Sequence, residues 1–121
     1  MTEPNARLEK AWLNRVAEFA QQHGAFPHQA NNNIELHHVA GRKAKHNKIH
    51  IGKWFVIPMM FDFHNPNSNH PLNVTHYRKR FTDRYGDQRT LWAQMATQIL
   101  AEDGDLPFDA EVINAIADTR Y

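Results

Sequence analysis

Histidine is the residue type in this chain with the clearest capacity for chemistry, because nine of the 121 residues are histidine. Five histidines in the central part of the sequence are the candidates for a shared site: His37, His38, His64, His70 and His76. Cysteine is absent, so a bound metal ion would have only nitrogen and oxygen ligands. Neutral imidazole binds divalent metals and also accepts protons near neutral pH. The central histidines therefore indicate a metal site with acid–base chemistry.

The adjacent pair, His37 and His38, lies in the segment 34–39, whose residues predict a short strand ended by Gly41. Consecutive side chains of a regular strand point to opposite faces. One imidazole can then bind a metal ion while its neighbour stays free to take a proton. Taken alone, such a pair also fits a surface strand that has no site.

The order of the other histidines favours a site. His64 opens an asparagine-rich loop after a second predicted strand, and His76 is expected on the helix that follows. A hairpin packed against that helix would bring His37, His64 and His76 together, with open positions for a phosphate oxygen. His70 could replace His64 as a ligand or contact a phosphate as an outer donor. Asp62 is a candidate oxygen ligand and equally a candidate cap for the loop.

The elements that would position these residues follow from apolar periodicity and turn residues. Residues 8–20 repeat apolar side chains at helical spacing, which predicts an N-terminal helix ending near Gly24. The apolar run 54–57 predicts a strand that is buried on both faces and closed by Pro58. Residues 25–33, 42–52 and 64–73 are rich in turn-forming or basic residues and are expected to be loops or connections.

Three helices are expected after the histidine-rich loop. The first would carry His76, Tyr77, Phe81 and Tyr85 and end at Gly86. The second would be capped by Asp87 and end at Gly104. The third would restart at residues 105–107 and bury Val112, Ile113, Ile116 and Ala117. The sequence therefore predicts an α+β fold in one domain, 1–121, with an N-terminal helix (1–24), a strand–strand–helix core (34–86) and C-terminal helices (87–121).

Positive charge is expected on both sides of the histidines, although the formal net charge is only +1. No acidic residue occurs between Glu35 and Asp62. The basic residues of this stretch are Arg42, Lys43, Lys45, Lys48 and Lys53, and a second group, Arg78, Lys79, Arg80 and Arg84, follows the loop. Such groups attract a polyanion by releasing its counterions. Either group taken alone favours the simpler interpretation, a solvated basic surface.

Composition limits the class of protein. The chain is 41% apolar, which is enough for one core. It has no apolar run near the roughly 20 residues that span a bilayer, and its first residues lack the order of a signal peptide. We expect a cytoplasmic protein with no membrane contact.

Several spaced motifs together resemble the HNH (ββα-metal) endonucleases, and within them the phage proteins of the recombination enhancement function (Ref) type. The motifs are Leu36-His37-His38-Val39-Ala40-Gly41-Arg42, Trp54-Phe55-Val56-Ile57-Pro58, Asn69-His70-Pro71-Leu72-Asn73-Val74-Thr75-His76, and Phe81 through Tyr85-Gly86-Asp87-Gln88. The resemblance extends over residues 34–92. Many relatives carry cysteines after the second strand, where this chain reads Met60-Phe61-Asp62-Phe63-His64, so apolar packing would replace those structural thiolates.

The resemblance implies roles for individual residues. His37 would be a metal ligand and His38 the general base. His64 and His76 would complete the metal shell, with His70 as the alternative to His64, and Asn73 or Asn69 of the loop would orient the base. Arg42, Lys43, Lys45, Lys48, Lys53, Arg78 and Lys79 would bind the nucleic-acid backbone. The cofactor would be one divalent ion, Mg²⁺, Mn²⁺, Zn²⁺ or Ni²⁺.

Three hypotheses about function follow. The first is a phage-encoded, recombination-linked DNA endonuclease that hydrolyses phosphodiester bonds, with DNA and a recombinase filament as partners. The second is a non-catalytic nucleic-acid-binding accessory protein on the same scaffold. The third is a plain α+β binding domain whose histidines are incidental, which predicts no metal above background in the purified protein.

Overall fold

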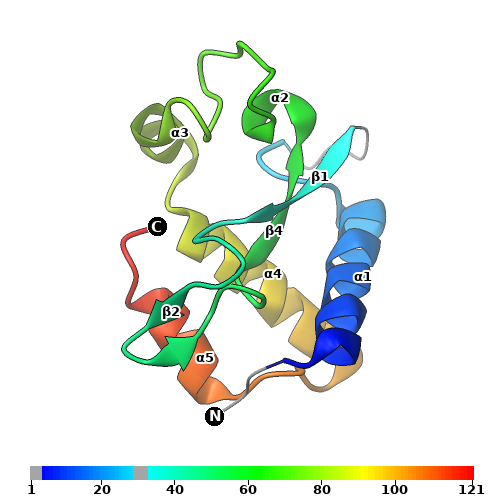
Figure 1. The fold of residues 1–121 in the computed structure, drawn as a ribbon. Coiled ribbons are helices and arrows are strands. Elements are labelled where there is room, and N and C mark those ends of the chain that lie inside the picture. The colour runs from blue at the N-terminus through cyan, green and yellow to red at the C-terminus, as the bar shows by residue number, and fades with distance from the viewer. Residues whose placement is uncertain (1–3, 29–32) are drawn as a thin grey trace.

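The computed structural model describes residues 4–28 and 33–121 and shows a mixed α+β arrangement (Figure 1). A long N-terminal helix, α1 (Ala6–His23), precedes a strand, β1 (Ile34–His38), a short hairpin of β2 (Lys45–His46) and β3 (Ile49–His50), and a second long strand, β4 (Val56–Met60). Four helices follow: α2 (Phe61–His64), α3 (Arg78–Tyr85), α4 (Gln88–Asp103) and α5 (Ala110–Ala117). The expected α+β class is confirmed. None of the helices in these ranges has the length and apolar character needed to cross a bilayer.

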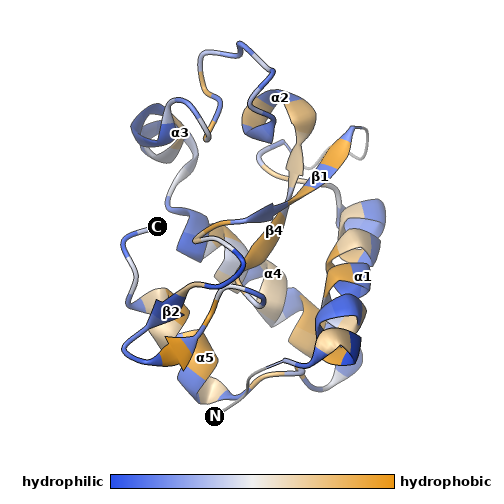
Figure 2. Ribbon diagram, in the orientation of Figure 1, coloured by the Kyte–Doolittle hydropathy of each residue, from blue (hydrophilic) through white to orange (hydrophobic). Residues whose placement is uncertain are grey.

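The antiparallel pair of β1 and β4 forms the centre of the fold. Ile34 lies opposite Met60 and His38 opposite Val56, so the start of β1 is next to the end of β4. Residues Trp54 to Ile57 are fully buried, as the apolar run predicts. Figure 2 shows β4 as an apolar strand, and it contacts both α1 and α4. The core therefore lies between the sheet and these two helices.

The prediction that Pro58 closes the second strand is wrong, because β4 continues through it to Met60. The carbonyl oxygen of Pro58 accepts a hydrogen bond from the amide of Phe26, 2.9 Å away. In an antiparallel strand the N–H and C=O groups of one residue point to the same side. The nitrogen of Pro58 therefore faces Phe26 rather than β1, and the missing N–H removes no hydrogen bond of the β1–β4 ladder.

The connection 42–52 contains a structure that its composition did not predict. Asn47 and Lys48 both have positive φ angles, of 50° and 67°, and form the two-residue turn between β2 and β3. Gly52 lies just after the hairpin, where an added Cβ would be 2.3 Å from the carbonyl oxygen of Gly41. Only glycine fits this close approach of two backbone segments.

Two further element boundaries differ from the predictions. The helix expected to carry His76 begins two residues later, at Arg78, because the Asn73 side chain accepts hydrogen bonds from the amides of Thr75 and His76 and holds them in a turn. The last helix begins at Ala110 rather than at 105–107, since the Asp109 side chain caps it. Gly24, Gly86 and Gly104 end their helices as predicted.

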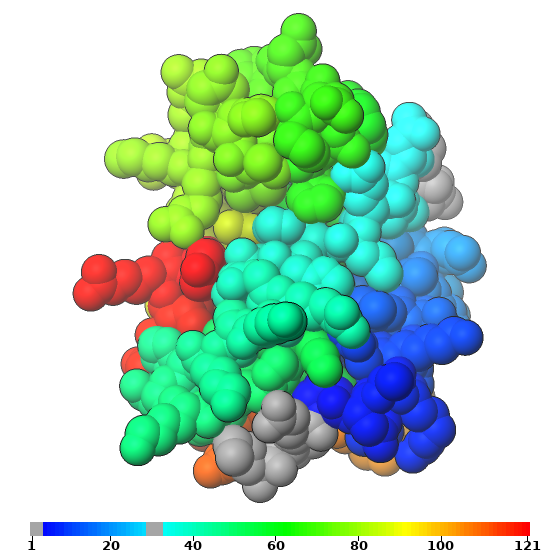
Figure 3. Space-filling view, viewed as in Figure 1, coloured from blue at the N-terminus to red at the C-terminus, as the bar shows by residue number. Residues whose placement is uncertain are grey.

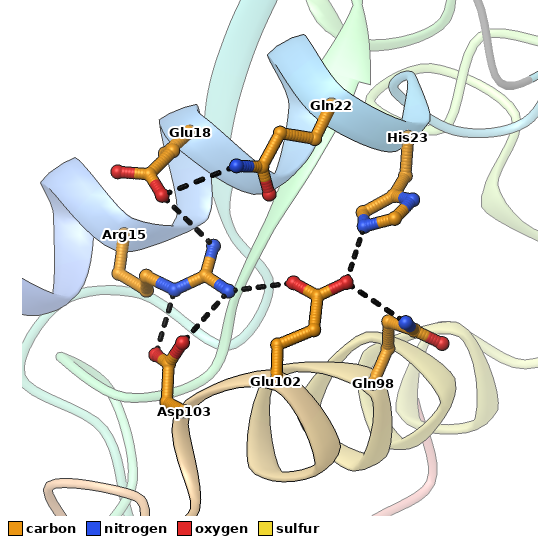
Figure 4. Close-up of polar contacts among 7 residues, drawn as sticks. All are labelled: Arg15, Glu18, Gln22, His23, Gln98, Glu102 and Asp103. Carbon is orange, nitrogen blue, oxygen red and sulfur yellow. Dashed lines mark hydrogen bonds and ion pairs between the residues drawn. The ribbon is translucent and has the colours of Figure 1, made fainter.

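Polar contacts join the C-terminal ends of α1 and α4. Arg15 donates to Asp103 at 2.7 Å and to Glu102 at 2.8 Å, and the second oxygen of Glu102 meets His23 Nε2 at 2.6 Å (Figure 4). The hydrogen bond from Gln98, followed by that from Arg15, lowers the pKa of Glu102 to about 2. Exposed pairs of this kind each contribute little to stability. They nevertheless link α1 to α4 through their side chains.

Candidate metal and nucleic-acid site

His37 and His64 lie against each other, with ring centroids 4.6 Å apart. His37 is on β1, and His64 is the last residue of α2, which follows β4 without a gap. Since β1 and β4 are antiparallel neighbours, the chain that leaves β4 turns back beside the first half of β1. The fold thereby brings together two imidazoles that are far apart in the sequence, as the central prediction required for this pair.

The orientation of His64 is set by a carboxylate. Its Nδ1 is 2.7 Å from Oε1 of Glu35, and Oε2 of the same carboxylate accepts a hydrogen bond from Asn65 Nδ2 at 2.8 Å. A carboxylate only accepts, so Nδ1 of His64 carries the hydrogen. The lone pair of a neutral His64 is therefore on Nε2, the nitrogen that can bind a metal ion or take a proton.

The orientation of His37 is set by Gln88, the first residue of α4. His37 Nε2 lies 2.8 Å from Gln88 Oε1, and Gln88 is only 1% exposed. The oxygen accepts, which leaves Nδ1 of His37 as the nitrogen with the lone pair. Burial, reinforced by the nearby His64, lowers the pKa of His37 to about 4. His37 is thus neutral at pH 7, which is the form that binds metals.

His38 faces the other side of β1, as the alternation of a regular strand predicts. The charges acting on it come from Glu9 and Arg42, which form a two-bond ion pair with distances of 2.7 and 2.8 Å. Nε2 of His38 is buried and has no hydrogen-bond partner in residues 4–28 and 33–121. Burial lowers the pKa of His38, an effect that Glu9 opposes. A neutral imidazole with an unused ring nitrogen is what a general base requires.

The other two predicted ligands, His70 and His76, make different contacts. Nδ1 of His70 accepts from the amide of Leu72 at 3.0 Å, and its ring packs on Phe63. Nε2 of His76 donates to the carbonyl oxygen of Pro66 at 2.7 Å. Within the described ranges, no three His, Asp or Glu side chains are grouped closely enough to hold a metal ion. The predicted shell of His37, His64 and His76, with His70 as the alternative to His64, stays a prediction, whereas the His37–His64 pair is formed.

The predicted loop asparagines differ in burial and in contacts. Asn73 is fully buried, and its Nδ2 donates to the carbonyl oxygens of Asp62 and Asn65. Its Oδ1 accepts from two amides farther along the chain. Asn69 is exposed. Asn73 therefore fixes the shape of the loop next to His64. For the candidate ligand Asp62, the hydrogen bonds found within residues 4–28 and 33–121 are accepted by its backbone oxygen.

Replacing Asn73 by alanine is expected to destabilise the protein by about 2 kcal/mol, because buried carbonyl and amide groups lose their partners. Asn69→Ala is the matched control and should change stability by less than about 0.5 kcal/mol, as exposed substitutions do. Urea denaturation of both variants measures the difference. Equal stability of Asn73→Ala and Asn69→Ala would show that the loop does not depend on these bonds.

The predicted backbone-binding cations fall into two groups. Arg42 is paired with Glu9, and Lys79 is paired with Asp83 at 2.8 Å, so part of their charge is already compensated. Lys43, Lys45 and Lys48 are exposed on and beside the hairpin, and Lys53 is half-buried. The guanidinium of Arg78 lies 5.1 Å from the centre of the Tyr121 ring. The hairpin therefore carries the uncompensated lysines.

Two residues of the site were missed at the sequence level. Glu35 stands two positions before His37, and the two-residue period of a strand places them on one face, so this signal was available. Gln88 gave no signal, because its contact with His37 depends on how α4 packs on the sheet. Comparisons with protein-family models, with curated proteins and with solved structures each find no match to this chain.

Proposed function

We propose that this chain is a metal-dependent DNA endonuclease of the HNH type, with one divalent cation held at His37 and His64. The observation that supports the proposal most is the pairing of these two imidazoles, each oriented by a second side chain, at a junction of strand and helix. Two neutral nitrogens with lone pairs fit a divalent ion that keeps open positions for water and phosphate. The ββα-metal core, the phage origin and the link to recombination belong to the same proposal.

The chain's own residues have separate tasks in this proposal. A bound divalent ion would supply charge neutralisation at the scissile phosphate and the leaving oxygen. His38 would take the proton of the attacking water at its unused Nε2, which is buried in the free protein and has to be uncovered when DNA binds. Glu35 and Gln88 keep the lone pairs of His64 and His37 available by holding the opposite ring nitrogens. Exposed lysines of the hairpin hold neighbouring phosphates, which makes binding strongly dependent on salt.

Nicking of supercoiled plasmid tests this function. The wild-type protein is incubated with Mg²⁺, Mn²⁺, Ni²⁺ or Zn²⁺, and in EDTA, with and without a recombinase filament. We expect relaxed plasmid with at least one of the ions and none in EDTA. His37→Ala should be inactive, whereas His23→Ala should keep its activity, because His23 lies on α1 and its ring nitrogen contacts Glu102.

A nucleic-acid-binding protein without turnover is the second candidate. It is favoured by one observation, the lack of a third metal-binding side chain near His37 and His64 in the described part of the chain. That candidate predicts salt-dependent DNA binding that is the same with EDTA and with each metal, and no nicking in any lane. Nicking that disappears in His37→Ala excludes it.

A further inference from the structure

A basic groove runs along the edge of the molecule that faces away from α1. It is a cavity of about 400 Å³ between the β2–β3 hairpin, the start of α3 and the last residues of the chain. In Figure 3 the C-terminal residues, coloured red, lie between the hairpin and the beginning of α3. Three elements that are distant in the sequence therefore form its walls.

The charged side chains lining this groove are Lys45, Arg78 and Arg120, and no acidic residue lines it. The neighbouring carboxylate of Asp118 is bound to His46 at 2.8 Å, and that hydrogen bond lowers the pKa of Asp118. No ion pair joins Lys45 or Arg120 to any residue within 4–28 and 33–121. The groove thus concentrates positive charge without an internal counter-charge, which favours an anionic occupant.

The groove is connected to the histidine pair through a single residue. The amide of Gln88 donates to the carbonyl oxygen of Tyr121, which lines the groove, at 2.6 Å. The side chain of the same Gln88 holds His37. Gln88 therefore contacts both a residue that lines the groove and a residue of the histidine pair.

We propose that this groove holds the phosphates of one polynucleotide strand. A phosphodiester of the same strand, next to the bound segment, would reach His37 and His64. This inference rests on the proposed function and names the path of its substrate. Three cations in one groove, with exposed Lys43 and Lys48 continuing the positive surface along the hairpin, match a chain of phosphates rather than a single small anion. Arg120 and Tyr121 join the residues expected to contact the backbone.

Fluorescence anisotropy with a labelled single-stranded oligonucleotide and the matching duplex, in EDTA and over a range of salt concentrations, tests the groove. Lys45→Glu/Arg120→Glu is compared with Arg7→Glu/Lys10→Glu, which reverses two exposed charges on α1. The groove variant should bind at least about tenfold more weakly than the control variant. Its slope of log affinity against log salt should be shallower by about 1.4 to 1.8, the loss of two phosphate contacts. Circular dichroism checks that both variants are folded.

Equal weakening in the two double variants would overturn the groove, because affinity would then follow net charge alone. Inorganic phosphate is also tested as a competitor of the labelled oligonucleotide. If it displaces the oligonucleotide completely at a concentration equal to that of the oligonucleotide's phosphates, the groove is a small-anion site and the proposal is overturned. The proposed function fails separately. A folded His37→Ala/His64→Ala protein is expected to bind the oligonucleotide with wild-type affinity in EDTA. If the wild-type protein binds DNA through the groove but nicks no plasmid with any metal, the proposed function is wrong and the proposed groove is retained.

Discussion

Replacing His38 with alanine is expected to lower the rate of phosphodiester cleavage by about 10² to 10⁴-fold, the usual contribution of a positioned general base. The affinity for metal should stay near that of the wild type, because His38 lies on the face of β1 opposite His37. DNA affinity should also be retained, since the exposed lysines are untouched. Single-turnover nicking of plasmid, combined with a metal titration, measures both quantities.

The environment of His38 explains why a large effect is expected. Its Nε2 has no partner among the residues described, and burial lowers its pKa, which favours the neutral imidazole that can accept a proton once water reaches this nitrogen. His23→Ala is the control for the loss of one imidazole elsewhere. Full activity of His38→Ala would contradict the base assignment. If Glu35→Gln were inactive at the same time, the Glu35–His64 pair would take that role.

Replacing His64 with alanine is expected to weaken the binding of divalent metal by at least about 100-fold and to abolish cleavage. The substitution removes one of the two nitrogens that the fold brings together. Glu35→Gln keeps His64 but replaces the carboxylate that holds its Nδ1, and it should weaken binding by about 10 to 100-fold, the usual cost of losing such a partner. Competition with a fluorescent chelator measures both affinities.

A spectroscopic measurement separates the positioning role of Glu35 from a merely structural one. Nitrogen chemical shifts of the His64 ring in the metal-free protein should show hydrogen on Nδ1 in the wild type and a mixture of tautomers in Glu35→Gln. His70→Ala is the control for both experiments, because His70 packs on Phe63 and serves the loop backbone. Metal binding that is unchanged in His64→Ala but lost in His70→Ala would reverse the choice between the two ligands.

Much of the fold could be predicted from local sequence patterns, because those patterns reflect local physical chemistry. The periodicity of residues 8–20 and the terminal glycines specify helices without help from distant residues, and the apolar run 54–57 correctly predicts burial, although the strand itself is Val56–Met60. The errors arise where a distant or side-chain contact decides. Pro58 remains in a strand because its nitrogen faces Phe26, and His76 stays outside α3 because Asn73 holds its amide.

The candidate site shows the same limit. Alternation along β1 correctly separated His37 from His38, and the order of the elements correctly joined His37 to His64. The roles assigned to His70 and His76 depended on the conformation of an irregular loop, which no periodicity describes. In the structure that loop is organised by the buried amide of Asn73.

Anomalous diffraction from crystals grown with Mn²⁺ tests the central claim most directly, because it locates the cation independently of activity. The account predicts one anomalous peak between Nδ1 of His37 and Nε2 of His64, and its loss in His64→Ala crystals grown in the same way. A peak bound by His70 or His76 without His37, or no peak in wild-type crystals that contain Mn²⁺ at concentrations supporting nicking, would contradict it.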